Sequence, residues 1–173
     1  MAGTMNPEMC LVLKNINYVE RYELLSKNAW IDSDDFPIDA LSSEDIMQII
    51  IQLGYSVSYN KKEQFYKIGL IEQELGYKIQ LNVAINTNTV EFIWAVYYNG
   101  DLRLGTPWGR CAKLLTNNEK KIAPPRYSDK DNLMRILSKA LKLYDDFVAE
   151  IIGLEPELRT SRSSSISVEN DTV

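Results

Sequence analysis

The sequence predicts an α+β fold: an antiparallel meander of four or five strands, packed by an N-terminal helical region, a short helix and a long C-terminal helix. Two patterns of apolar residues indicate this. Apolar and polar side chains alternate between residues 55 and 104, whereas residues 128–152 repeat apolar side chains at helical spacing. Side chains recur about every two residues on a strand face and about every 3.6 on a helix face, so each pattern identifies its element.

Residues 6–28 are predicted to form the N-terminal helical region. Asn6 can cap a helix through its side chain, and Pro7 suits the first helical position, where a backbone N–H is not needed. Asn15 and Asn17 interrupt the apolar stripe. We therefore expect the region to divide into two pieces at these residues.

An acidic loop follows, and then a second helix. Residues 30–37 contain Asp side chains and a proline, which favour turns over regular structure. Ser42 or Ser43 is expected to cap the next helix, because a Ser side chain accepts a hydrogen bond from the first free N–H groups. Gly54 supplies the left-handed residue that ends this helix.

The alternating segment predicts consecutive strands joined by short turns. Asn99 and Gly100 form a dipeptide typical of the two-residue type I′ turn, which requires a positive φ at both positions. Gly76 opens the strand with the most regular alternation. The predicted strands cover residues 55–59, 65–71, 77–85, 90–98 and 101–104.

The strand predicted at 90–98 is apolar on both faces, which leaves two arrangements open. In the first, helices cover both faces of the sheet, and we expect this arrangement because three helical segments are available. In the second, one face packs on the helices and the other offers aromatic side chains, including Tyr97, to a partner. An open aromatic patch of that kind would be large enough to be functional.

Residues 105–110 break the alternation with two glycines that flank Trp108, followed by Arg110. Such a loop can present Trp108 as an exposed anchor beside Arg110, and these residue types often dominate the energetics of protein interfaces. In the alternative arrangement, Trp108 folds back and closes the end of the sheet. A short helix is expected at 110–115.

The most regular helical pattern begins after Ser128, which is expected to cap it, and continues to residue 152. Gly153 is the predicted end of this helix, whose apolar stripe is expected to cover the sheet. The residues that follow are polar and Ser-rich, so they cannot bury enough surface to offset the entropy of ordering. The sequence thus predicts one domain at 1–153 and a disordered tail at 154–173.

Composition limits the classes of function. The chain of 173 residues suffices for one domain, and its net charge of −5 disfavours binding to nucleic acid or to anionic lipid. No stretch approaches the ~20 apolar residues of a membrane span, and residues 1–9 lack the features of a signal peptide. A cytoplasmic location is therefore expected, with Cys10 and Cys111 buried and reduced, and one long-range disulfide between them is the alternative.

The sequence contains no His, which removes the commonest general base and the commonest metal ligand. It also lacks the glycine-rich phosphate loops of nucleotide-binding proteins, and we expect no cofactor. Paired carboxylates remain the enzymatic alternative. The candidates are three acidic-loop residues and two side chains that the fold could bring near them: Asp32, Asp34, Asp35, Glu91 and Asp101.

The order of helix, antiparallel meander and long helix in a small acidic chain resembles two groups of bacterial proteins. One group is the immunity proteins of polymorphic toxin systems. The other is the class I type III secretion chaperones, whose helix-Leu-Gly-strand opening is similar to residues 46–54 and the strands after them. The first resemblance implies an acidic, aromatic surface that occludes a toxin's active cleft. The second implies a dimer that holds an unfolded effector segment.

These observations predict a protein-binding module rather than an enzyme. An immunity or inhibitor protein that occludes a partner's active surface is the first hypothesis, and a dimeric chaperone-like protein is the alternative. The partner would be a toxin or an effector protein, and the protein itself would be a monomer or a homodimer. The candidate partner-binding residues are aromatic, basic and acidic side chains from the loops and strands: Trp108, Arg110, Tyr97, Asp101, Asp34 and Asp35.

Overall fold

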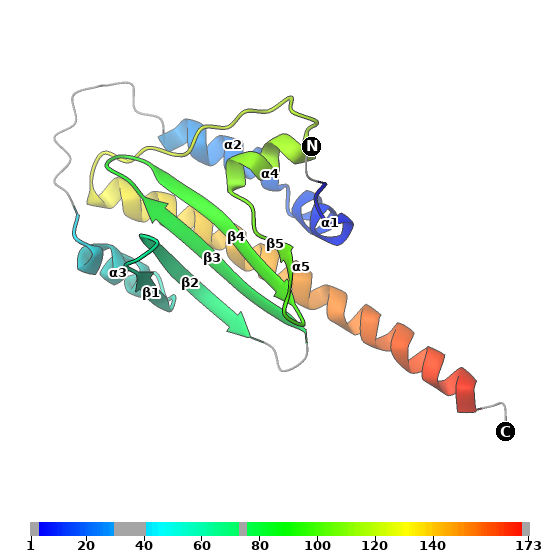
Figure 1. The fold of residues 1–173 in the computed structure, drawn as a ribbon. Coiled ribbons are helices and arrows are strands. Elements are labelled where there is room, and N and C mark those ends of the chain that lie inside the picture. The colour runs from blue at the N-terminus through cyan, green and yellow to red at the C-terminus, as the bar shows by residue number, and fades with distance from the viewer. Residues whose placement is uncertain (1–3, 30–40, 73–75, 171–173) are drawn as a thin grey trace.

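The structure is a computed structural model that describes the backbone of residues 4–29, 41–72 and 76–170. Within these ranges an antiparallel sheet packs against N-terminal and C-terminal helices, which confirms the predicted α+β class (Figure 1). The helices are α1 (Pro7–Asn15), α2 (Tyr18–Ala29), α3 (Ser43–Gln52), α4 (Trp108–Leu115) and α5 (Lys130–Asn170). The strands are β1 (Val57–Asn60), β2 (Phe65–Glu72), β3 (Tyr77–Ile85), β4 (Val90–Tyr98) and β5 (Asp101–Leu104).

The sheet is a sequential meander in the order β1-β2-β3-β4-β5, with every neighbouring pair antiparallel. β3 and β4 form its regular centre, because they pair without interruption from Tyr77 opposite Tyr98 to Ile85 opposite Val90. The short β1 and β5 lie at the two edges. The predicted meander is therefore present, with five strands.

Several helices begin or end at the polar and positive-φ residues that the sequence predicts as their boundaries. The Asn6 side chain caps α1, and Asn17, with a φ of 55°, separates α1 from α2. Ser42 caps α3 in a capping box with Asp45. Gly54, with a φ of 95°, ends α3 in the left-handed conformation.

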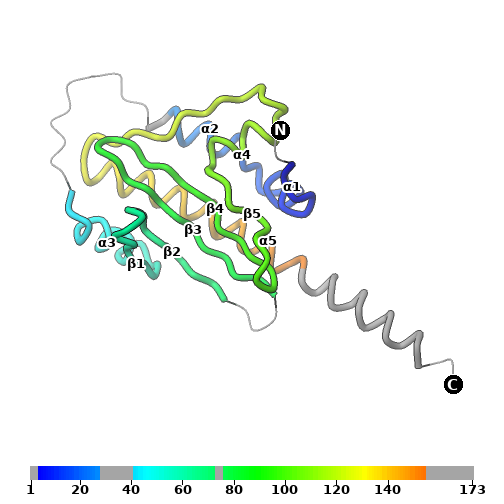
Figure 2. Tube along the Cα trace, in the orientation of Figure 1, coloured from blue at the N-terminus to red at the C-terminus, as the bar shows by residue number. Residues whose placement is uncertain are grey.

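The described helices lie on one side of the sheet. α5 runs behind the strands in Figures 1 and 2, α3 packs beside β1, and α4 packs beside β4. Burial alternates accordingly along β3, where Ile79 and Leu81 are fully buried and the intervening Lys78 is exposed. The expectation that helices cover both faces is therefore wrong for the described residues, and the arrangement with one open face is the one observed.

An aromatic cluster fills the space between β4 and the helices. Trp94 of β4 stacks on Trp108 of α4, with ring centroids 4.8 Å apart, and on Phe147 of α5 at 4.1 Å. Tyr18 of α2 donates a hydrogen bond to the backbone oxygen of Trp108. All four side chains are fully buried, and buried aromatic rings contribute much of a core's hydrophobic stabilisation. The cluster thus holds α2, α4 and α5 against the sheet.

α5 begins and ends later than predicted. Asp129, rather than Ser128, supplies the cap, because its Oδ1 accepts a hydrogen bond of 2.7 Å from a backbone N–H in the first turn. Gly153 does not adopt a positive φ, so the helix continues through it to Asn170 and the predicted end is wrong. The side chains of 155–173 lie outside the described residues, and the disorder predicted for this tail stays a prediction.

Candidate functional site

No described element packs on the second side of the sheet, which is named here the open sheet face. Side chains alternate across a strand, so this face is formed by every second residue of the central strands. It combines polar side chains on β3 with apolar side chains on β4 and β5. The open sheet face includes Lys67, Leu70, Lys78, Gln80, Asn82, Ile93, Ala95, Tyr97 and Leu102.

The most exposed apolar part of this face lies where β4 turns into β5. Tyr97 pairs directly with Leu102, and their side chains are 37% and 59% exposed. The β-carbons of directly opposed residues lie about 5 Å apart. Tyr97 and Leu102 therefore form one continuous apolar surface at the end of the sheet.

The open sheet face is hollowed beside Tyr97. The depression has a volume of about 670 Å³, and its walls include Phe65, Gln80, Tyr97 and the Asn99–Gly100 turn. The Gln80 amide donates a hydrogen bond to the side chain of Asn82, which leaves other amide atoms of both residues available to a bound molecule. A protruding side chain of a partner would find both an aromatic ring and hydrogen-bonding groups there.

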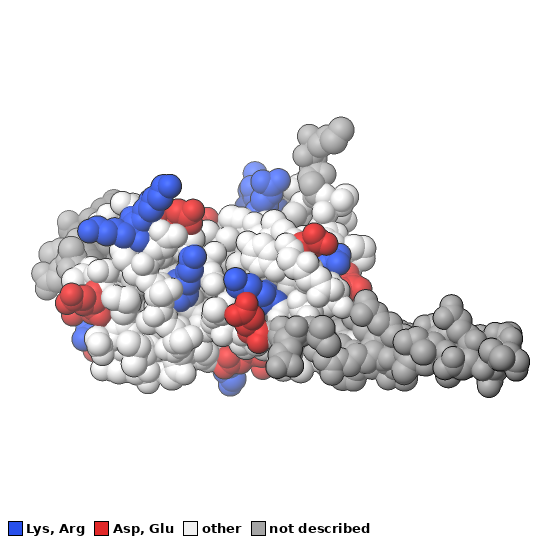
Figure 3. Space-filling view, turned by 60° about the horizontal axis from the view of Figure 1, so that its bottom comes forward, with Lys and Arg blue, Asp and Glu red and all other residues white. Residues whose placement is uncertain are grey.

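Both signs of charge occur on and around the open sheet face. Lys78 lies opposite Glu72 across the β2–β3 pair, and the Lys67 Nζ lies 5.8 Å from the centroid of the Phe65 ring. Figure 3, turned by 60° from the view of Figure 1, also shows Lys and Arg interspersed with Asp and Glu. A nucleic-acid surface would present a single basic patch, whereas mixed charge around apolar residues is usual at the rim of a protein interface.

The structure places only part of the predicted binding set at this face. Tyr97 lies on it, and Asp101 begins β5 with an exposed side chain. Trp108 is fully buried, so its prediction as an exposed anchor is wrong and the folded-back alternative is correct. Asp34 and Asp35 lie outside the described residues.

The start of α4 explains why Trp108 and Arg110 separate. The helix begins at Trp108, two residues before the predicted start at 110. This directs the Trp108 ring onto Phe92 and Trp94, at centroid distances of 4.6 Å and 4.8 Å. Arg110 is exposed instead and lines a separate cleft beside α4. The two residues therefore do not form the joint anchor that the sequence suggested.

No protein-family model matches the chain, and neither does any curated protein or solved structure. The resemblance to immunity proteins and secretion chaperones therefore stays an expectation, and function is argued from the surface of this molecule. None of the described helices combines the length and apolarity that crossing a membrane requires.

The two described carboxylates of the enzymatic alternative lie far apart. Glu91 pairs with Ala84 near the start of β4, while Asp101 pairs with Tyr98 at its end. Strand residues rise about 3.4 Å each, so roughly 24 Å separates the two positions. Glu91 and Asp101 therefore cannot act together as an acid–base pair. Within the described residues, no three His, Cys, Asp or Glu side chains could jointly hold a metal ion.

The predicted binding set omits Leu70 and Leu102, which are 48% and 59% exposed. The position of Leu102 could have been predicted from the turn at 99–100. A two-residue hairpin turn pairs the flanking residues in order, so Leu102 lies opposite Tyr97. Leu70 has no comparable signal. It lies within the bulge between Ile68 and Ile71 that shifts the register of β2, and a bulge is not evident from alternation alone.

Proposed function

We propose that this protein is a non-catalytic binding module whose open sheet face docks on a folded partner protein. Its action is that of an immunity or inhibitor protein, which occludes the partner's active surface. The observation that carries the proposal is the exposed pair of Tyr97 and Leu102 on a sheet face that no described element covers.

The chemistry of the open sheet face supports a protein partner. Tyr contributes a large apolar body and a hydroxyl at low entropic cost, so it is frequent at the energetic centres of interfaces. The depression beside Tyr97 provides a place for a partner side chain, and Lys78, Gln80 and Asn82 supply a polar border. The net charge of −5 would also raise the association rate with a basic partner.

The decisive experiment compares two matched variants. Tyr97→Arg places a charge on the open sheet face, and Leu24→Arg places the same charge at a leucine of α2 that is 60% exposed. The tagged wild-type protein is used to isolate a partner from its native cell, and the affinity is then measured with both proteins purified. We expect Tyr97→Arg to weaken binding at least about tenfold, the loss of roughly 1.4 kcal/mol usual for an interface centre, and Leu24→Arg to leave it unchanged.

Two results would contradict the proposal. Equal affinity of Tyr97→Arg and the wild type for the purified partner would remove the open sheet face from the interface. If the tagged wild-type protein isolates no partner that still binds after purification, the proposed binding function itself is contradicted. Light scattering adds a further readout: a mass near 19.8 kDa is expected for a monomeric inhibitor, whereas twice that mass would favour the dimeric chaperone-like alternative.

A further inference from the structure

A second cleft lies beside α4, on the border of the helical layer. It is enclosed by α4, by the loop at 118–124 and by the start of β4, and its volume is about 740 Å³. This α4 cleft is defined by its polar lining residues, Tyr22, Glu91, Arg110, Lys113 and Lys121. The volume lies within the range of roughly 300–1,000 Å³ that is usual for small-molecule sites.

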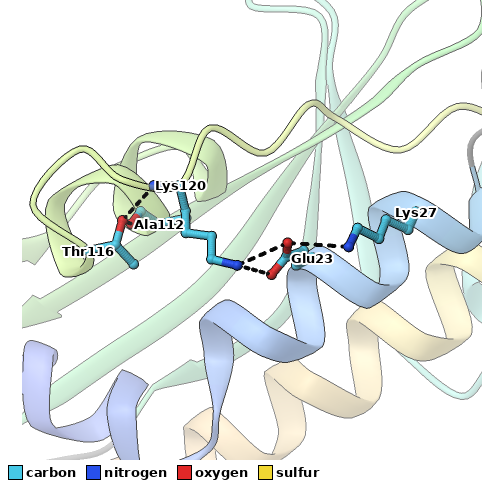
Figure 4. A network of polar contacts seen from close by, with 5 residues as sticks. All are labelled: Glu23, Lys27, Ala112, Thr116 and Lys120. Atoms are coloured by element: carbon cyan, nitrogen blue, oxygen red, sulfur yellow. Dashed lines mark hydrogen bonds and ion pairs between the residues drawn. The ribbon is translucent and has the colours of Figure 1, made fainter.

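The loop wall of the α4 cleft is held in place by contacts to α2. Lys120 Nζ lies 2.8 Å from Glu23 Oε2, and the Lys120 backbone N–H donates a hydrogen bond of 3.1 Å to Thr116 Oγ1 (Figure 4). Ser26 of α2 also donates a hydrogen bond to the backbone oxygen of Ala123. Because both ends of the loop are anchored, the cleft is formed before any ligand enters.

The lining of the α4 cleft carries an excess of positive charge. Arg110, Lys113 and Lys121 are exposed, and none of them forms an ion pair or a side-chain hydrogen bond with another described residue. Glu91 is the one acid among the lining residues. Lys120, the neighbour of Lys121, is paired with α2 instead. Three unpaired cations around one cleft are unusual in a protein whose net charge is −5.

Tyr22 brings a buried hydrogen-bond donor to the same cleft. Its side chain is only 1% exposed, and its ring packs edge-on against Trp108 with centroids 5.4 Å apart. The hydroxyl forms no hydrogen bond with any described residue, although Tyr22 lines the cleft. Burial, together with the negative charge of Glu91, raises the pKa of Tyr22 well above its usual value, so the hydroxyl keeps its proton. Since the hydroxyl is not one of the completely enclosed polar atoms that lack a partner among the described residues, it opens into the cleft, where a bound group can accept its hydrogen bond.

We propose that the α4 cleft binds a small molecule bearing an oxyanion, such as a phosphate or a carboxylate group. The Tyr22 hydroxyl donates a hydrogen bond to the anion, while Arg110, Lys113 and Lys121 surround it with positive charge. The apolar wall, which includes Ile122 and Pro124, contacts the remainder of the ligand. This inference does not depend on the open sheet face or on a protein partner.

Calorimetric titration of the full chain tests the proposal. The probes are inorganic phosphate, pyrophosphate and citrate at constant ionic strength, with a hexaglutamate peptide as a separate arm. We expect at least one small probe to bind with a Kd of about 1 mM or tighter. Tyr22→Phe should weaken that binding about tenfold, because a hydrogen bond to a charged group is lost while the ring remains.

Charge variants provide the matched comparison. Lys113→Glu with Lys121→Glu should weaken binding by more than about tenfold, whereas Lys61→Glu with Lys62→Glu, in the turn after β1, makes the same change in net charge and should leave it unchanged. Glu91→Gln should have the opposite effect and tighten binding about threefold or more, since it removes a like charge from the cleft.

Three outcomes would overturn the proposal. In the first, no small probe binds more tightly than about 10 mM. In the second, the control pair at 61 and 62 weakens binding as much as the cleft pair, which would indicate non-specific attraction. In the third, only the peptide binds, which would assign the cleft to an acidic partner segment. If Tyr22→Phe does not fold by circular dichroism, the lysine pairs and Glu91→Gln decide the question.

Discussion

The backbone of β2 lies close to α5 at Gly69, where the ring of Tyr144 takes the space of a side chain. Gly69 has a φ of +64°, and a Cβ built there would lie 2.9 Å from Tyr144 Cε1. The Tyr144 hydroxyl oxygen lies 2.7 Å from the backbone oxygen of Gly69 and 3.1 Å from that of Ile79, so its one proton is shared between the two acceptors. Tyr144 of α5 therefore contacts one carbonyl group in the bulge of β2 and one in β3, which ties the helix to two neighbouring strands.

Substitution of Gly69 should be more destabilising than substitution of a comparable glycine without neighbours. Gly69→Ala combines left-handed strain with displacement of the Tyr144 ring, so we expect a loss of about 2–4 kcal/mol in the free energy of unfolding. Gly100, with a φ of +85° and no atom within 4 Å of its built Cβ, is the control. Gly100→Ala should cost only about 1–2 kcal/mol. Urea denaturation compares the two, and equal losses would refute the role of Tyr144.

Individual residues differ in how far the sequence predicts them. Asn99 and Gly100 were identifiable because their conformation depends on their own backbone, and the φ angles of 49° and 85° confirm the turn. Gly69 and Trp108 were not, because their conformations depend on rings contributed from other elements. Trp108 points inward since Trp94 and Phe92 offer it more buried aromatic contact than solvent does.

At the scale of elements, local capping sets where α3 begins. Ser42 Oγ accepts a hydrogen bond of 3.1 Å from the Asp45 N–H, and Asp45 Oδ2 accepts one of 3.3 Å from the Ser42 N–H. Both bonds join residues three positions apart, so the sequence was enough to narrow the cap to Ser42 or Ser43, and the structure assigns it to Ser42. The end of α5 was mispredicted because glycine permits the left-handed conformation without requiring it, and Gly153 keeps a helical φ.

The capping box predicts different effects at two adjacent serines. Ser42→Ala should lower the free energy of unfolding by about 1 kcal/mol, because it removes the acceptor for an N–H group at the start of α3. Ser43→Ala, one position into the helix, should have little effect, because its side chain is not the cap. Thermal unfolding followed by circular dichroism measures both. A larger loss for Ser43→Ala than for Ser42→Ala would contradict the assigned cap.

At the scale of the whole molecule, the layer order was less predictable than the elements. The apolar residues on both sides of β4 suggested two helical layers. On the open side, however, Ala95 is buried with no described helix above it, and the backbone of Ile93 forms a β-bridge with Pro107. The sequence therefore left two arrangements possible, one with both faces of the sheet covered and one with the open sheet face. The α4 cleft could not be anticipated, because it joins Tyr22 to residues of β4, α4 and the following loop that are distant in the sequence.

The buried phenols and thiol of the fold predict lability at high pH. Burial raises the pKa of the Cys111 thiol to about 12 and that of Tyr66 to about 12, and it also raises the pKa values of Tyr18 and Tyr144 well above the usual value of a phenol. These groups hold their protons in the folded state at pH values where the unfolded chain releases them. Their contribution to stability is therefore complete below the unfolded pKa values and is lost as pH rises toward the folded ones.

We expect the free energy of unfolding to fall between about pH 9 and about pH 12, by up to about 1.4 kcal/mol per pH unit for each fully buried group. The urea midpoint should fall with it. Near-ultraviolet absorbance of tyrosinate supplies an independent measure, since the native chain should ionise fewer tyrosines than the urea-unfolded chain at the same pH. A midpoint that stays constant over this range would show that the phenols and the thiol titrate alike in both states.

The packing of the N-terminal helices on α5 joins the two ends of the described chain. Asn15 Nδ2 donates a hydrogen bond of 3.3 Å to Glu150 Oε2, and Arg21 Nη1 lies 2.8 Å from Asp146 Oδ2. On a translating ribosome α1 and α2 emerge about a hundred residues before α5, roughly 5–20 s earlier at usual elongation rates. The hairpins of the meander can form within that interval because they join sequence neighbours. The apolar sides of the nascent α1 and α2 therefore stay exposed until α5 has emerged.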